Sequence, residues 1–133
     1  MIFVDTNVIV DVVTNNPGWQ GWSLQQLDAA ALRGRLVINA VVYAELSIGF
    51  ERLEEVDAAL ATAAIDVVEI PRGALFVAGK AFREYRRRGG TRTGVLPDFF
   101  IGAHAAVLSA TLVTRDAGRY RTYFPTLELI APN

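Results

Sequence analysis

Four carboxylic acids of this 133-residue chain stand at positions from which they could build one acid–base or metal-binding site: Asp5, Glu45, Asp98 and Asp116. Asp5 and Asp116 each follow a short apolar run that is typical of a buried strand. Asp98 falls in the first turn of a predicted helix, and Glu45 lies early in another helix among apolar residues, where an acid needs a partner. Strand ends and first turns also attract acids for capping alone, so only their joint placement indicates function.

Four converging carboxylates would repel one another. At an effective dielectric constant near 20, two such charges about 5 Å apart repel by roughly 3 kcal/mol. Shared protons, cationic side chains or a bound hard cation would relieve this repulsion. Only Arg115 lies beside these acids in the sequence, so a divalent cation is the simplest remedy. The chain has no Cys and one His, which excludes thiolate and histidine-rich sites, and oxygen ligands favour Mg²⁺ or Mn²⁺. Such an ion in turn favours phosphoryl-transfer chemistry.

The order of apolar and periodic segments predicts how these acids are positioned. Short apolar runs predict strands at residues 2–4, 36–38, 67–70 and 112–113, with a possible fifth at 127–130. Helical periodicity covers residues 23–33, with Ser23 as its cap, then 42–64, broken at Gly49, then 73–88 and 97–109. This alternation predicts a three-layer α/β/α domain with a parallel sheet of four to five strands. In such a sheet Asp5 and Asp116 share the edge formed by the carboxyl ends of the strands.

Composition limits the classes of protein that the chain could be. With 52% hydrophobic residues and a net charge of −1, residues 1–133 should fold as one domain, without a global basic field or an acidic excess. No apolar run reaches the roughly 18 to 20 residues that span a bilayer, and the N-terminus does not begin like a signal peptide. A soluble, cytoplasmic protein is therefore expected.

Charge is nevertheless segregated along the chain. Residues 80–92 carry six cations and one acid, whereas residues 45–69 carry seven acids and one Arg. A charge run is usually a solvated face, but arginines near an acidic site could also hold a phosphate backbone. The candidates for contact with a phosphate backbone are Arg83, Arg86, Arg87, Arg88, Arg92 and Arg115.

The acids lie within four motifs: VDTNVIVD at 4–11, INAVVYAELSIGF at 38–50, LPDFFIGAHA at 96–105 and LVTRD at 112–116. In this order and with these flanks, the chain resembles a PIN-domain ribonuclease, specifically the VapC-type toxin of type II toxin–antitoxin systems, over essentially its whole length. The fourth motif departs from the family pattern, because it continues Ala-Gly-Arg-Tyr instead of the more common acid followed by an aromatic residue.

The resemblance carries specific implications for residues and partners. It implies a single PIN-like domain, Mg²⁺ or Mn²⁺ as cofactor, endonucleolytic cleavage of RNA, a homodimer, and an antitoxin that docks a C-terminal segment into the acidic site. The catalytic and metal-binding residues would be Asp5, Glu45, Asp98 and Asp116, with Asn7 and Thr114 as polar supports.

Two other functions share part of this pattern. A catalytically silent PIN-like domain could serve as an RNA- or protein-binding module, although four intact acids argue against it. A phosphatase that forms an aspartyl-phosphate also has an acid at the end of its first strand. It needs a second Asp two residues later, where this chain has Asn7.

Several neighbouring side chains are expected to be structural. Helical geometry turns Asp11 away from Asp5, which predicts a solvent-exposed side chain. It also turns His104 away from Asp98, which argues against a general-base role. Gly102 shares the Asp98 face of its helix, as does Ala105, so these small residues predict a close approach of that helix to the sheet. Trp19 and Trp22 could stack on nucleobases, but helix packing or a dimer contact is the simpler role.

Overall fold

All five strands form one parallel sheet in the order β3-β2-β1-β4-β5. The structure, a computed structural model, describes residues 1–133. Its strands are β1 (Ile2–Val4), β2 (Leu36–Ile38), β3 (Ile65–Val67), β4 (Thr111–Val113) and β5 (Leu129–Ile130). Val4 is paired with Val113, so β1 and β4 end level with each other. The residues that follow these two central strands therefore leave the sheet side by side, where the strand order reverses and α/β proteins bind ligands.

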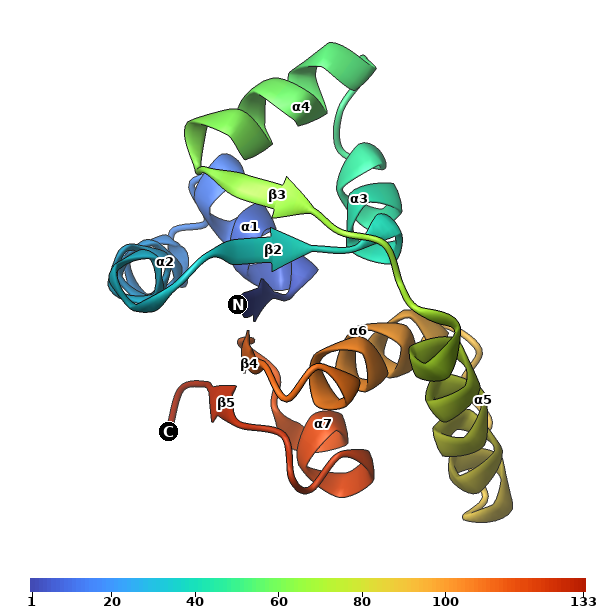
Figure 1. The fold of residues 1–133 in the computed structure, drawn as a ribbon. Coiled ribbons are helices and arrows are strands. Elements are labelled where there is room, and N and C mark those ends of the chain that lie inside the picture. Colours follow the sequence, from blue (N-terminus) through green and yellow to red (C-terminus); the bar gives the residue numbers. More distant parts are fainter.

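Seven helices connect and cover the strands (Figure 1). The first two connections hold α1 (Thr6–Val13), α2 (Gln20–Arg33), α3 (Ala40–Ser47) and α4 (Leu53–Thr62), and the last two hold α5 (Arg72–Arg87), α6 (Leu96–Val107) and α7 (Gly118–Tyr123). From β1 to β3 the chain crosses the sheet in one direction, and from β3 to β5 it crosses in the other. Because parallel crossovers are right-handed, this reversal places α5, α6 and α7 on the face opposite α1 and α2. The predicted three-layer α/β/α fold with a parallel sheet is thus confirmed.

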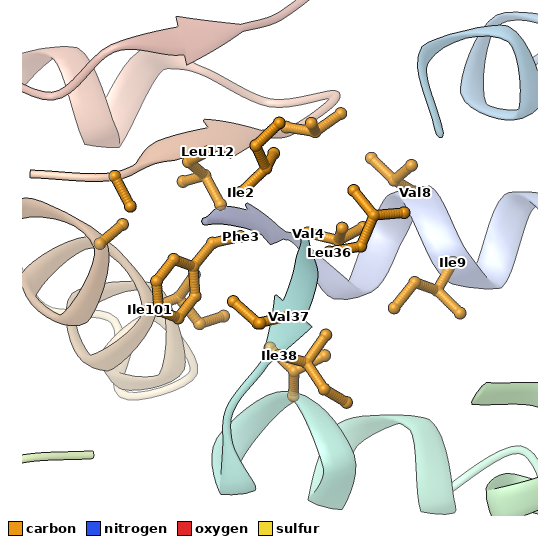
Figure 2. Close-up of a cluster of buried hydrophobic side chains, with 14 of the residues drawn as sticks. Ile2, Phe3, Val4, Val8, Ile9, Leu36, Val37, Ile38, Ile101 and Leu112 are labelled. Carbon is orange, nitrogen blue, oxygen red and sulfur yellow. The ribbon is translucent and has the colours of Figure 1, made fainter. Parts of the chain in front are cut away.

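The central strands are buried on both faces, which explains their unbroken apolar sequence. Successive side chains alternate: Figure 2 shows Phe3 directed toward Ile101 of α6, whereas Val4 lies with Leu36 on the side of Val8 in α1. All five of these side chains are buried. This burial on both faces fixes the register of β1, because a shift of one residue would exchange the side chains that face α6 with those that face α1.

Several elements differ from the prediction, and α1, at Thr6–Val13, lies outside the predicted helical segments. β3 spans Ile65–Val67 and not 67–70, so the edge strand begins two residues early and only its first residue is buried. α2 begins at Gln20, and Ser23 lies inside the helix instead of capping it. α7 was not predicted, because six residues are too few for helical periodicity to be visible. The predicted break near Gly49 is confirmed, since α3 and α4 are separate helices.

The predicted exposure of Asp11 is wrong, because its side chain is fully buried. Its carboxylate accepts hydrogen bonds from the Ser23 hydroxyl at 2.8 Å and from the Arg115 guanidinium at 2.9 and 3.0 Å. The guanidinium also lies over the Trp19 ring, which meets Trp22 edge-on. Helical geometry correctly turned Asp11 away from Asp5, but α2 and the loop after β4 cover the face on which it lies. This ion pair fixes that loop against α1 and α2.

Gly102 brings α6 close to α7, not to the sheet as predicted. A Cβ atom on Gly102 would lie 2.6 Å from two ring carbons of Phe124 and 3.0 Å from the Tyr120 ring. Since Phe124 and Tyr120 are both buried, neither ring has free space into which it could move. The missing side chain therefore lets Tyr120 pack against the helix that carries Asp98.

None of the helices is both long and apolar enough to cross a membrane.

Candidate active site

Asp5 lies at the centre of the acidic site. It follows β1 directly and caps α1, where its Oδ1 accepts the backbone N–H of Thr6 at 2.7 Å. Its Oδ2 accepts the hydroxyl of Thr114 at 2.8 Å and the hydroxyl of Tyr120 at 2.9 Å. Only 5% of the residue is exposed. Three donors from α1, the end of β4 and α7 thus fix both oxygens of one buried carboxylate.

The environment of Asp5 disfavours its charge. Burial raises its pKa from 3.8 to about 6, and the negative charge of Asp98 acts in the same direction. The hydrogen bonds from Thr114, Tyr120 and Thr6 lower the pKa and offset part of this effect. A carboxylate that is still costly to ionise after accepting three hydrogen bonds is a site where a cation would be stabilising.

Tyr120 joins two of the acids and was missed by the sequence analysis. Its ring and hydroxyl are buried, and the hydroxyl oxygen lies 2.9 Å from Oδ2 of Asp5 and 3.5 Å from Oδ1 of Asp98. One hydroxyl has a single proton, so the shorter contact identifies Asp5 as the acceptor. Burial and the charges of Asp5 and Asp98 raise the pKa of Tyr120 well above its usual value. The phenol therefore stays neutral and remains a donor.

Asp98 lies in the first turn of α6, as predicted, and forms an ion pair with Arg119 of α7. Burial raises the pKa of Asp98, while Arg119 lowers it and the nearby charge of Asp116 raises it. Asp98 is therefore electrostatically coupled to Asp5 on one side and to Asp116 on the other.

Glu45 faces the site from α3. Its Oε1 accepts the hydroxyl of Thr6 at 2.6 Å, and its charge contributes to raising the pKa of Tyr120. Thr6 was not singled out from the sequence, although its position beside Asp5 made its hydroxyl a reasonable candidate. It holds Asp5 through its backbone N–H and Glu45 through its side chain.

The loop after β4 carries the fourth acid of the site, Asp116. The hydroxyl oxygen of Thr114 accepts the backbone N–H of Asp116 at 3.1 Å, and Oδ1 of Asn7 accepts the backbone N–H of Arg115 at 3.2 Å. Asp116 itself is exposed. Thr114 and Asn7 thus have the contacts of structural supports, holding the loop that carries Asp116.

The donor set suits a hard divalent cation, since every candidate ligand atom is a carboxylate oxygen and the fold brings all four acids to one edge of the sheet. In the structure described, however, no three acidic or histidine side chains surround a common point as ligands of one metal ion. Asp98 is paired with Arg119, and Tyr120 lies between Asp98 and Asp5. The chemistry of the residues fits the ion, and binding it requires side chains to rearrange.

Other candidate residues lie outside this cluster. His104 is fully buried against Phe3, with ring centroids 4.6 Å apart, and burial lowers its pKa. The five arginines between residues 83 and 92 are exposed at the end of α5 and in the loop after it. Arg88 pairs with Glu84, whereas Arg115 is held by the buried Asp11. The structure therefore leaves the arginines of α5 freer than Arg115 to contact another molecule.

The raised pKa of Asp5 predicts a pH dependence of stability. A folded-state pKa of about 6 against 3.8 in the unfolded chain means that folding favours the protonated acid. This stabilisation is present below pH 3.8 and is lost as the pH rises through 6, amounting to about 3 kcal/mol for such a shift. We expect the free energy of unfolding of the metal-free protein, relative to that of Asp5→Asn, to fall by up to this amount between about pH 4 and pH 7.

Urea unfolding in EDTA at several pH values measures this difference. Asp28→Asn is the matched control, because Asp28 is an exposed acid on α2, and its difference from the parent should not change over the same range. Wild-type and Asp5→Asn curves that stay parallel with pH would show that Asp5 ionises normally in the folded protein.

Comparison with known proteins identifies the family of the chain and similar folds. A model of the PIN domain family matches residues 2–125, and no curated protein matches the chain. Among solved structures, a chain of VapBC2 from Rickettsia felis, bound to a DNA fragment from its promoter, is 23% identical with a TM-score of 0.75, and the alignment covers 100% of both chains. VapBC-1 from nontypeable Haemophilus influenzae gives 24% identity and a TM-score of 0.70, covering 98% of both chains. FitAcB from Neisseria gonorrhoeae gives 21% and 0.70, covering 98% of this chain and 96% of that one. The chain belongs to the PIN domain family.

Proposed function

We propose that this protein is a divalent-metal-dependent endoribonuclease and the toxin of a type II toxin–antitoxin pair. The observation that carries the proposal is the Asp5 carboxylate, which is buried at the carboxyl end of the central strand beside a second acid. A fold that keeps such a costly group among like charges needs a compensating ligand. Membership of the PIN domain family and the positions of all four motif acids support a nuclease.

Mg²⁺ or Mn²⁺ is the proposed cofactor. Asp5 and Asp98 would hold it, with Glu45 and Asp116 on either side. When bound, such an ion supplies a water of lowered pKa and neutralises charge that develops on a phosphate.

The remaining contacts position the acids. Thr114 and Tyr120 donate to Asp5 and fix the orientation of its carboxylate. Thr6 fixes Glu45. Asp116, which is exposed, is the acid most accessible to an incoming phosphodiester or to a water molecule. Asp5 and Glu45, held in this way, would need little reorganisation during the reaction, and preorganised charged groups of this kind accelerate reactions.

The RNA backbone would lie along the exposed arginines of the α5 segment. Arg83 and Arg87 are one helical turn apart and both exposed, and neither forms an ion pair within the chain. Their cationic groups are therefore available to phosphates. Arg86, Arg88 and Arg92 would add to the same surface. Arg115 is a weaker candidate than the sequence indicated, because Asp11 already neutralises it.

An antitoxin is the proposed protein partner. The similar solved chains come from complexes named VapBC2, VapBC-1 and FitAcB, and another comes from a toxin–antitoxin complex of Klebsiella pneumoniae. On this chain, an apolar groove of about 520 Å³ runs between α1, α2 and α4. A second groove of about 300 Å³ includes Thr6 and Glu45, and both are lined by Val13. A partner segment could therefore lie on the apolar groove and reach the acidic site. A homodimer and a cytoplasmic location complete the proposal.

Cleavage of RNA in the presence and absence of metal tests the proposed activity. We expect purified protein to cut total RNA with Mg²⁺ or Mn²⁺ and to stop when EDTA is added, because the acids alone cannot neutralise the phosphate. Asp5→Asn should lower the cleavage rate by about 100-fold or more, as loss of a preorganised electrostatic group typically does.

Asp28→Asn, which removes an exposed acid far from the β1 and β4 strand ends, should cleave like the wild type. Cleavage that persists unchanged in EDTA would rule out the metal mechanism. RNA binding without cleavage and without calorimetric binding of Mg²⁺ or Mn²⁺ would favour the silent binding module instead.

Salt dependence of RNA binding tests the role of α5. On a single strand, log affinity falls with log salt by about 0.7 for each phosphate contact, because condensed counterions are released. In an inactive Asp5→Asn background, Arg83→Ala combined with Arg87→Ala should weaken binding across sequences and reduce this slope by about 1.4, the sum for two lost contacts. Arg72→Ala removes a cation from the other end of α5 and should leave the slope unchanged. An unaltered slope in the double variant, with impaired dimer or antitoxin assembly, would assign the segment to a protein interface.

A further inference from the structure

Arg119 is the one cationic side chain that pairs with any of the four site acids. Its Nη1 contacts Oδ2 of Asp98, and the two side chains are 23% and 32% exposed. The other oxygen of Asp98 lies 3.5 Å from the buried hydroxyl of Tyr120. Oδ2 of Asp98 therefore accepts from Arg119, whereas Oδ1 faces the Tyr120 hydroxyl, whose proton is donated to Asp5.

This pairing bears directly on metal binding. Carboxylate oxygens are the preferred ligands of a hard divalent cation, but the cation is repelled by a positive charge held at the same carboxylate. The guanidinium contacts Oδ2 of Asp98, where it already partly neutralises the acid. A metal ion that uses Asp98 must consequently compete with Arg119.

The Arg119 side chain is also placed so that it can move away from Asp98. It is the second residue of α7 and follows Gly118, and its side chain is partly exposed. The next residue, Tyr120, is buried against α6 and hydrogen-bonded to Asp5. Because Tyr120 anchors the helix, the Arg119 side chain can change rotamer without unfolding α7. Rotamer changes of partly exposed side chains are fast compared with enzyme turnover.

We propose that Arg119 is a positioning residue: an internal counter-ion of Asp98 that a divalent cation must displace, so that it sets the metal affinity of the acidic site. The Asp98–Arg119 ion pair holds the acids together in the absence of metal, and it weakens metal binding by the free energy needed to break it. This inference rests on the proposed metal-dependent function and concerns the same site.

Calorimetric titration of the full chain with Mn²⁺ and with Mg²⁺ tests the competition directly. Arg119→Gln should bind both ions about tenfold more tightly than the wild type, since an ion pair of this partial exposure is worth on the order of one factor of ten. Arg121→Gln is the matched control, because Arg121 lies on the same helix, is exposed, and pairs with no acid. Its affinity should change by less than about twofold. Arg119→Lys keeps a positive charge at the position and should restore most of the wild-type affinity.

A measurement on the unmodified protein covers the case in which Arg119→Gln does not fold. In nitrogen-15 NMR spectra, the side-chain signals of Arg119 should shift as diamagnetic Mg²⁺ is added, while those of Arg121 should not. Signals of Arg119 that stay unchanged while Mg²⁺ binds would overturn the inference.

The outcomes separate this inference from the proposed function. Equal Mn²⁺ affinities for wild type and Arg119→Gln, with metal-dependent cleavage intact, would overturn the role of Arg119 and leave the nuclease proposal standing. Unchanged metal affinity with weaker RNA binding would make Arg119 a phosphate contact and likewise overturn the counter-ion role. If neither protein binds metal and neither cleaves RNA, both proposals fail.

Discussion

Burial of the Asp5 carboxylate is the constraint on which the rest of the site depends. A carboxylate at the end of a central strand loses most of its contact with water, and its three hydrogen bonds offset only part of that loss, as its raised pKa shows. Each donor comes from a different part of the fold: Thr6 from α1, Thr114 from the end of β4 and Tyr120 from α7. The acid therefore has its fixed position only when the sheet and both helical layers are assembled.

The short helix α7 links packing to chemistry. Gly102 has no side chain, so Tyr120 and Phe124 can pack directly on α6. This contact delivers the Tyr120 hydroxyl to Asp5, and it places Arg119 beside Asp98. On the other side of β4, the Arg115–Asp11 ion pair fixes the loop that leads into α7. The two arginines that flank Asp116 thus have different partners: Arg115 is bound to the buried structural acid Asp11, and Arg119 to Asp98 of the candidate site.

The sequence predicted the fold class, and it predicted that the four acids lie at one edge of the sheet, because both features leave local signals. Parallel strands buried on two faces appear as unbroken apolar runs, and the acids follow those runs or begin helices. It could not reveal Asp11 as buried, because burial there depends on α2 and the β4 loop meeting over one face of α1. Gly102 was recognised as a site of close approach, but its partner lies in a helix too short to leave a periodic pattern. For the same reason Tyr120 was missed, since nothing local distinguishes a tyrosine that joins two acids from one that only fills a core.

The central claim is that this edge of the sheet binds a divalent cation through Asp5 and Asp98. Anomalous diffraction from crystals grown with Mn²⁺ measures this most directly, because it locates the ion and shows its neighbouring side chains together. The account predicts an anomalous peak within coordination distance of both carboxylates, with the Arg119 guanidinium turned away from Asp98. Crystals containing Mn²⁺ in which no peak lies beside Asp5, and in which Arg119 still pairs with Asp98, would contradict it.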